Sequence, residues 1–222
     1  MALTTLEYVK TAIGVSTSDK DAMLSLYLDA ASEEIKRYLG LNIEQGTYTE
    51  YHTGNLTTRL ALRQIPVTTL SGVWLKSDGY FDTRDGGFGS ENLLVEGTDY
   101  VLDRSPASNL SKSGILYRIG TVWPMLHRTA TLNRLTVDLG PSWGNIKVTY
   151  TAGYSTVPKD IQLACAILVS RFVETASHGG WQFNKETIGD YSYTQGPVHL
   201  NSKLPEFGGI LGLLAPYKEL GW

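Results

Sequence analysis

The stretch NIKVTYTAGYSTVPKDIQLACAILVSRFVETA, from Asn145 to Ala176, changes its period partway along. Up to Gly153, apolar and β-branched residues alternate with polar ones, which is the period of a strand. From Ile161 onward the residues are apolar on nearly every helical face, and Pro158 suits the first turn of a helix. The stretch predicts a strand and then a helix. That helix is buried on all sides, or its own fold and a neighbouring molecule cover it jointly.

A short helix is predicted at the N-terminus. Thr4 and Glu7 have the spacing of a capping box with Thr4 as N-cap, and Gly14 can end the helix. Ser18 and Asp21 repeat the capping pattern before a second helix.

The second helix is predicted to end at Gly40 and to be amphipathic, with Glu33 and Arg37 as an ion pair four residues apart. Its apolar stripe consists of Leu24, Leu28, Ala31, Ile35 and Leu39, and its polar stripe of Ser25, Asp29, Ser32 and Lys36.

The sequence from Thr47 to Gly153 has a period of two, punctuated by turn residues. The predicted strands are TYTEYHT (47–53), TRLAL (58–62), VTTLSGVWL (67–75), DYVLD (99–103), GILYRIG (114–120) and NIKVTYTAG (145–153). Polar loops are expected at 77–92 and from Pro106. Because the helices lie outside the β block in sequence, the order favours an α+β fold over an alternating α/β fold.

Two segments near the C-terminus have the character of interaction elements. In ETIGDYSYTQ (186–195) the spacing after Gly189 predicts a strand with Tyr191 and Tyr193 on one face. The final segment, from Leu204, is apolar at helical spacing but weakened by glycines, so it should fold against a surface. That surface is either the chain's own bundle or a partner. The predicted partner-binding residues are Ile188, Tyr191, Tyr193, Phe207, Leu211, Leu214, Tyr217 and Trp222.

Composition excludes several classes of protein. The net charge is −3, whereas a dedicated DNA-binding protein has a basic face. The single cysteine, Cys165, excludes an internal disulfide and a multi-cysteine zinc site, and it reads as a small buried hydrophobe. The four histidines show no metal-ligand spacing. No signal peptide and no transmembrane run is recognised, so the chain is expected to be made and kept in a cytoplasm.

No catalytic set stands out in the sequence. Asp78, Asp82 and Asp85 share one glycine-rich loop, but their spacing does not fit a calcium-binding EF-hand. Glu186 and Asp190 form the best local carboxylate pair, a weak indication of a glycosidase. Neither a phosphate-binding loop nor a nucleophile elbow occurs. We therefore predict no catalytic residues, no cofactor and no metal, and expect a structural or interaction protein.

The chain resembles the head–tail connector, or adaptor, proteins of tailed bacteriophages, which lie beneath the portal in the neck of the virion. The resemblance rests on TLEYVKTAIGV (5–15), DKDAMLSLYLDAASEEIKRYLG (19–40), Ile65-Pro66-Val67, VTYTAGYSTVPKDIQLA (148–164), ETIGDYSYT (186–194) and Leu214-Ala215-Pro216-Tyr217. It fades between about Ser77 and Leu139, where the chain has a longer β block than compact members of the family.

The resemblance implies an α+β fold in which a small helical bundle carries an inserted antiparallel β block and a C-terminal docking tail. We expect a bundle formed by 1–46 and 154–180, a β-rich insertion at 47–153, and an interaction arm and tail at 181–222. The implied function is a ring of twelve copies that extends the DNA channel.

The implied partners are the portal protein, neighbouring copies, and the next neck, stopper or tail protein. Genomic DNA would pass through without specific binding. Assembly is expected in the bacterial host cytoplasm, and the final location is the virion neck. Two alternatives stay open. One is another phage structural protein, such as a tail-completion or baseplate component. The other, less favoured, is a carbohydrate-active enzyme of the particle that uses Glu186, Asp190 or the loop aspartates.

Overall fold

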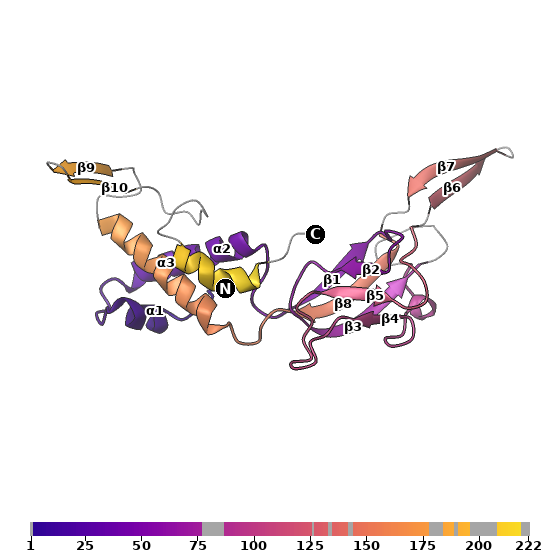
Figure 1. Ribbon diagram of the computed structural model, residues 1–222, viewed down its shortest axis with the longest axis horizontal. Helices are drawn as coiled ribbons and strands as arrows, with labels where there is room; N and C mark the ends of the chain where they lie inside the picture. The colour runs from indigo at the N-terminus through magenta and orange to yellow at the C-terminus, as the bar shows by residue number, and fades with distance from the viewer. Residues whose placement is uncertain are drawn as a thin grey trace. The chain divides into compact units, whose positions relative to one another are not determined.

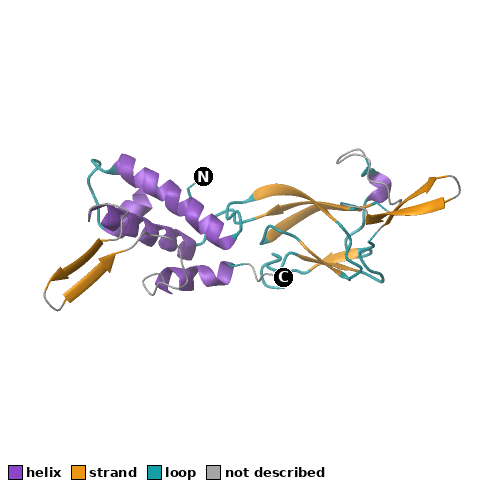
Figure 2. Ribbon diagram, turned by 90° about the horizontal axis from the view of Figure 1, so that it is seen from above, coloured by secondary structure: helices purple, strands orange, loops and turns teal. Residues whose placement is uncertain are grey.

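The structure is a computed structural model that describes residues 2–76, 87–125, 127–132, 135–141, 144–177, 184–188, 191–195 and 208–218. The chain divides into two compact units, and the first is built from both ends of the sequence. Unit 1 comprises Met1–Glu44 and Ser155–Trp222, and unit 2 comprises Gln45–Tyr154. Figure 2 shows the long helices gathered in one unit and most strands in the other, so the predicted α+β class is confirmed. The finer division into bundle, insertion, arm and tail stays a prediction.

Unit 1 is organised around one helix. Its helices are α1 (Leu6–Ile13), α2 (Asp21–Leu39), α3 (Lys159–Ser177) and α4 (Gly208–Leu214), followed by a short 3₁₀ helix, η3 (Ala215–Tyr217). The other three α-helices each pack against α3 (Figure 1). This explains why the sequence of α3 is apolar on so many faces. An uncovered stripe begins at Leu163, which is 40% exposed, and continues through half-buried Ile167.

The ends of the first two helices differ in part from the sequence prediction. The N-cap of α1 is Thr5 and not Thr4, since the Thr5 hydroxyl accepts a hydrogen bond from the Tyr8 amide at 3.2 Å. The N-cap of α2 is Lys20, which makes no side-chain capping bond. Gly14 and Gly40 end the two helices as predicted. Both have the left-handed backbone that glycine adopts without a Cβ clash.

The predicted apolar stripe of α2 is buried as expected, but two polar assignments were wrong. Arg37 pairs with Glu34, and Glu33 pairs with Lys36, so the ion pairs are three residues apart and not four. Ser32 is buried and not exposed. Its hydroxyl donates to the Leu28 carbonyl at 2.7 Å and accepts from the Leu3 amide at 3.0 Å. A fully hydrogen-bonded serine costs little to bury, and this one ties the N-terminal segment to the bundle.

Unit 2 contains two three-stranded antiparallel sheets and a separate hairpin. The sheets have the strand orders β1-β8-β3 and β2-β5-β4, and β6 pairs only with β7 among the described strands (Figure 1). The strands are β1 (Gly46–His52), β2 (Arg59–Ala61), β3 (Val67–Leu75), β4 (Tyr100–Leu102), β5 (Ile115–Arg118), β6 (His127–Leu132), β7 (Leu135–Pro141) and β8 (Ile146–Ala152). All six predicted strands are present, whereas β6 and β7 were not predicted.

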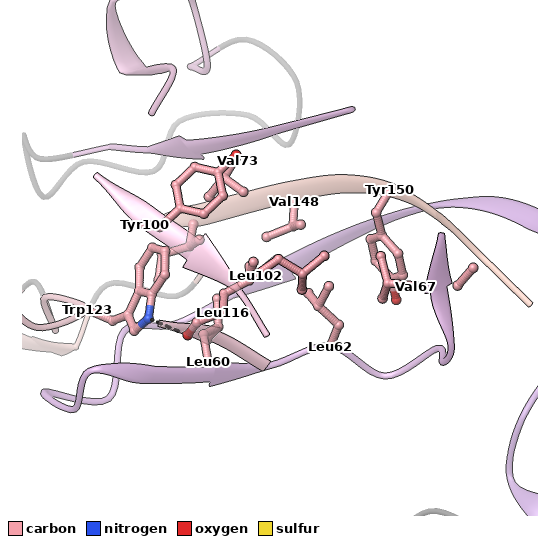
Figure 3. Close-up of a cluster of buried hydrophobic side chains, with 12 residues drawn as sticks. Leu60, Leu62, Val67, Val73, Tyr100, Leu102, Leu116, Trp123, Val148 and Tyr150 are labelled. Carbon is pink, nitrogen blue, oxygen red and sulfur yellow. Dashed lines mark hydrogen bonds between the residues drawn. The ribbon is translucent and has the colours of Figure 1, made fainter. Parts of the chain in front are cut away.

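The two three-stranded sheets share one core. Along β8, buried and half-buried residues alternate, and buried residues from the second sheet pack in the same cluster (Figure 3). Trp123 is fully buried there, and its indole donates to the Leu116 carbonyl at 3.4 Å. The cluster consists of Leu60, Leu62, Val67, Val73, Tyr100, Leu102, Leu116, Trp123, Ile146, Val148, Tyr150 and Ala152.

Of the two predicted polar loops, the one from Pro106 lies between β4 and β5 as expected. The loop at 77–92 is described only from Gly87, and it contains a short 3₁₀ helix, η1 (Ser90–Asn92). Residues 77–86, with Asp78, Asp82 and Asp85, lie outside the described residues.

Candidate interaction surfaces

The C-terminal helix lies on the chain's own bundle. Within α4, Ile210 and Leu214 are 2% and 0% exposed, and α4 packs against α3. In η3, the Tyr217 hydroxyl donates to Asp160 Oδ2 at 2.8 Å, which links the tail to the first turn of α3. The tail was expected to fold on a surface, and the described part does so within unit 1.

The predicted tail residues divide into three groups. Leu214 is buried, whereas Leu211 and Tyr217 are half-buried. Phe207 and Trp222 lie outside the described residues. After η3, the Lys218 ammonium lies 4.7 Å from the centre of the Tyr38 ring, a cation–π contact with α2. The described tail therefore contacts its own bundle at three points and leaves Leu211 partly accessible.

The segment around ETIGDYSYTQ forms a hairpin rather than a single strand. Strands β9 (Asn184–Ile188) and β10 (Tyr191–Gln195) pair antiparallel, with Ile188 opposite Tyr191 and Glu186 opposite Tyr193. Paired residues share a face of a ladder, so the register brings Ile188, Tyr191 and Tyr193 to one face. The opposite face carries Lys185, Thr187, Ser192 and Thr194.

Strand β9 was missed because its residues, Asn184 to Ile188, are mostly polar. A usable signal was present, since Gly189-Asp190 between two short runs is a hairpin pattern. Both of these residues lie outside the described ones. The other described strands do not pair with this hairpin, and a two-stranded ladder by itself is marginally stable in water.

Unit 2 contains a compact titratable cluster that sequence reasoning missed. The Glu50 carboxylate accepts hydrogen bonds from His52 Nε2 at 2.8 Å, from the Tyr150 hydroxyl, and from the Arg63 amide at 3.3 Å. Burial disfavours the charged form, but the bonds from His52 and Tyr150 outweigh it and hold the pKa of the Glu50 carboxyl below its ordinary value. Burial, and then the bond to Glu50, raise the pKa of Tyr150.

This cluster is built to hold the fold. The Tyr150 hydroxyl also accepts from the Gln64 amide at 3.0 Å, so one carboxylate and one phenol fix the turn after β2. The Glu50 side chain is 11% exposed and its oxygens already have partners. A saturated carboxylate has little capacity left to activate a substrate or water. The sequence could have indicated this cluster only through Glu50 and His52, which lie two residues apart on one face of β1. Their partner Tyr150 is remote in sequence, so the full cluster could not be predicted.

The described residues give little support to metal or acid–base chemistry. No group of three or more His, Cys, Asp or Glu side chains suited to a metal occurs among them. Glu186 lies in β9 opposite Tyr193, whereas Asp190 lies outside the described residues. Cys165 is buried as predicted, and burial raises its pKa to about 11. In the part of the chain that is described, no helix has the length and apolar character needed to cross a membrane.

One sheet of unit 2 exposes apolar side chains on the face that points away from the core. In the β2-β5-β4 sheet, the cross-strand row of Leu60, Leu116 and Leu102 is buried. The next row consists of Arg59, Tyr117 and Val101, which lie on the opposite face of the sheet. Val101 is 43% exposed, and Ile119, two residues beyond Tyr117, is 40% exposed. We call Arg59, Val101, Tyr117 and Ile119 the outer sheet face.

Comparison with known proteins gives a consistent result. The family model described as Head completion protein matches residues 2–87, which is less than half of the chain. The matched segment covers α1, α2 and the first three strands of unit 2. No curated protein matches the chain.

The chain also resembles solved neck structures. A chain from the neck of an empty GTA particle, computed with C6 symmetry, is 15% identical with a TM-score of 0.54, over 99% of this chain and 91% of that one. A chain from the neck of a native GTA particle, computed with C12 symmetry, is 16% identical with a TM-score of 0.50, over 100% and 96%. A chain from the virion of a native gene transfer agent particle is 16% identical with a TM-score of 0.52, over 99% and 91%.

These findings confirm the resemblance to phage head–tail connector and completion proteins. At 15% to 16% identity, the structural likeness establishes the fold. It extends over nearly the whole chain, including the region between about Ser77 and Leu139 where the sequence resemblance faded.

Proposed function

We propose that this protein is a structural head–tail connector of a tailed phage or a related particle. Copies of it would form a ring beneath the portal that extends the DNA channel and docks the next neck or tail protein. The observation that carries the proposal is the likeness of fold, over 99% of the chain, to a chain from a particle neck. The Head completion protein match at residues 2–87 supports it independently, since it rests on sequence.

The proposed ring has twelve copies. A solved neck of similar fold was computed with C12 symmetry, and another with C6 symmetry, of which twelve is a multiple. The net charge of −3 suits a channel that DNA traverses without being gripped, because tight non-specific binding needs several phosphate contacts from Lys or Arg. The final location of such a ring is the neck of the virion.

The β9–β10 hairpin is proposed as the arm that meets the portal or a neighbouring copy. Its two tyrosines and Ile188 share one face by register, and tyrosines supply a large contact area at low entropic cost. In the tail, Leu211 and Tyr217 are the proposed contacts among the described residues, with Phe207 and Trp222 in the adjoining segments. The paired variants Tyr193→Ala and Ser192→Ala test the arm, because they alter opposite faces of one strand.

We further propose that the protein has no enzymatic activity. The described titratable cluster is internally satisfied, and the chain carries no recognised catalytic motif. A tail-completion or baseplate component is the closest alternative, since the neck likeness concerns fold. A carbohydrate-active enzyme is less favoured and is tested by hydrolysis assays on peptidoglycan and capsular sugars with Glu186→Gln.

Imaging the purified chain mixed with the portal protein of the same particle tests the function. We expect closed twelve-fold rings seated on one end of the portal, with an open central channel. A chain that stays monomeric and does not bind the portal, or one that binds only tail components, would overturn the connector function.

A further inference from the structure

The β6–β7 hairpin is amphipathic by register. Four of its cross-strand pairs are in regular succession: Leu132 with Leu135, Thr131 with Thr136, Ala130 with Val137, and Thr129 with Asp138. Successive pairs lie on opposite faces of a ladder. One face therefore carries Ala130, Leu132, Leu135 and Val137, and the other carries Thr129, Thr131, Thr136 and Asp138. We call the first set the apolar hairpin face.

No described strand extends this ladder, and among the described elements β6 and β7 pack extensively only against each other. Three or more strands, or packing on another element, are needed before a hairpin is stable by itself. The register therefore gives the hairpin an apolar face for which the described elements supply no pairing strand and no packed helix.

The described residues on either side of the hairpin, 123–125 and 144–145, are tied together and form its root in unit 2. Asn145, 1% exposed, donates from Nδ2 to the Pro124 carbonyl at 2.8 Å, which joins the segment before β6 to the segment after β7. The Asn145 Oδ1 accepts from the Gly54 amide at 3.0 Å. A Cβ at Gly54 would lie 2.0 Å from the Pro124 carbonyl oxygen, so the three segments are in close contact. The buried Trp123 anchors the same root in the core. The chain therefore leaves the core of unit 2 before β6 and returns to it after β7 at one place.

The same unit also exposes apolar side chains on the outer sheet face. Six of the eight large apolar side chains that are exposed among the described residues belong to unit 2, namely Leu56, Leu93, Val95, Val101, Ile119 and Val122. Val101 and Ile119 lie on this face beside Tyr117, and the Arg59 guanidinium lies 5.6 Å from the centre of the Tyr117 ring. The hairpin face is apolar by register, and the outer sheet face exposes Val101 and Ile119, so each offers apolar surface that the other can cover.

We propose that the apolar hairpin face of one copy docks on the outer sheet face of the next copy. This inference rests on the proposed ring, which places a second copy of unit 2 beside every hairpin. Because the donor and acceptor are different surfaces of one chain, the contact is heterologous, and repeated contacts of that kind close into a ring where the rotation from one copy to the next closes. The threonine face would then be turned to solvent, which suits its composition. A second copy is favoured over another protein because the chain itself supplies the matching surface.

Engineered cysteines test the contact directly. The native Cys165 is buried and its pKa is raised to about 11, so it gives little thiolate to compete with added thiols. The pair Leu132→Cys with Val101→Cys joins the proposed surfaces, and the matched control Thr131→Cys with Val101→Cys uses the opposite hairpin face. Mild oxidation, at high concentration and with the portal present, should give covalent multimers with the first pair and monomer with the control.

Charge substitutions give a second readout. Leu135→Asp should weaken self-association by about tenfold or more, because it puts a charge where the proposed contact would bury a leucine. Thr136→Asp, its neighbour on the opposite face, should leave association unchanged. Both variants should keep the wild-type melting temperature, since the hairpin lies outside the unit 2 core.

The outcomes separate this inference from the proposed function. Twelve-fold rings that form normally with Leu135→Asp and give no face-specific cross-link would overturn the hairpin contact and leave the connector function standing. Face-specific cross-links that join copies into open chains, with no closed ring on the portal, would support the contact and overturn the connector function. Cross-links within single copies, or loss of binding to another protein without any change in self-association, would also overturn the hairpin contact.

Discussion

The C-terminal helix α4 and the β6–β7 hairpin are both short amphipathic elements, yet of the two only α4 packs against another described element to any extent. Helix α4 includes Gly208, Gly209 and Gly212, so its local stability is poor, but Ile210 and Leu214 are buried on its own bundle. The hairpin has four regular cross-strand pairs, and its flanking residues Pro124 and Asn145 are hydrogen-bonded, but no described strand extends its ladder. The local stability of an element therefore does not determine whether its apolar face is packed within the chain. An element whose apolar face is not packed there is a candidate contact for assembly.

Truncating one leucine in each element should give the largest contrast. Leu214→Ala should destabilise the protein by about 2–5 kcal/mol, because it removes a fully buried side chain from unit 1. Leu135→Ala, a matched change on the hairpin, should leave the free energy of unfolding nearly unchanged and weaken self-association. Denaturant titration measures the first effect and sedimentation the second. Equal losses of stability in the two variants would mean that the hairpin is covered within one chain.

Acid should lower the free energy of unfolding of unit 2, which carries the β6–β7 hairpin. The folded-state pKa of Glu50 is below its ordinary value of 4.5, so the charged carboxylate contributes stability above that pH. The contribution is lost as the pH falls from 4.5 through the lower folded-state pKa. In Glu50→Gln the amide cannot reproduce every bond, so stability at neutral pH should fall by about 1–3 kcal/mol. Its decline between about pH 5 and pH 3 should also be shallower. Parallel pH profiles for wild type and variant would show that Glu50 carries no such contribution.

Removing the tail's hydrogen bond should have a moderate effect. In Tyr217→Phe the bond to Asp160 is lost while the ring stays, and a bond to a charged acceptor contributes about 1.5 kcal/mol, less where solvent reaches it. Proteolysis near the C-terminus should become faster, because the last turn is released more often. The matched variant Tyr193→Phe, on the β9–β10 hairpin, should leave this rate unchanged.

Strengthening α4 should have the smallest effect, in the opposite direction. An added Cβ at Gly212 meets no atom within 4 Å, so Gly212→Ala should gain up to about 1 kcal/mol from helix propensity alone. For a protein of this size that corresponds to an increase in melting temperature of about 2–4 °C. A lower melting temperature would show that the helix needs glycine there for close packing or for movement during assembly.

The amino-acid sequence alone determined the α+β class, the first three helices, six strands of unit 2 and strand β10, because period and end signals are local properties of a chain. The stripe from Leu24 to Leu39 and the alternation along β8 are both patterns of this kind. The sequence also indicated the connector resemblance and a tail that needs a surface.

Tertiary structure decided which residues are buried and which segments contact one another. Ser32 reads as polar surface but is buried, since its two hydrogen bonds depend on Leu3 and on the neighbouring turn of α2. Glu50 and Tyr150 are a hundred residues apart and meet only because β1 pairs with β8. The surface for α4 is α3, whereas the β6–β7 ladder has no cover among the described elements. Burial depends on contacts between segments remote in sequence, which a local pattern cannot specify.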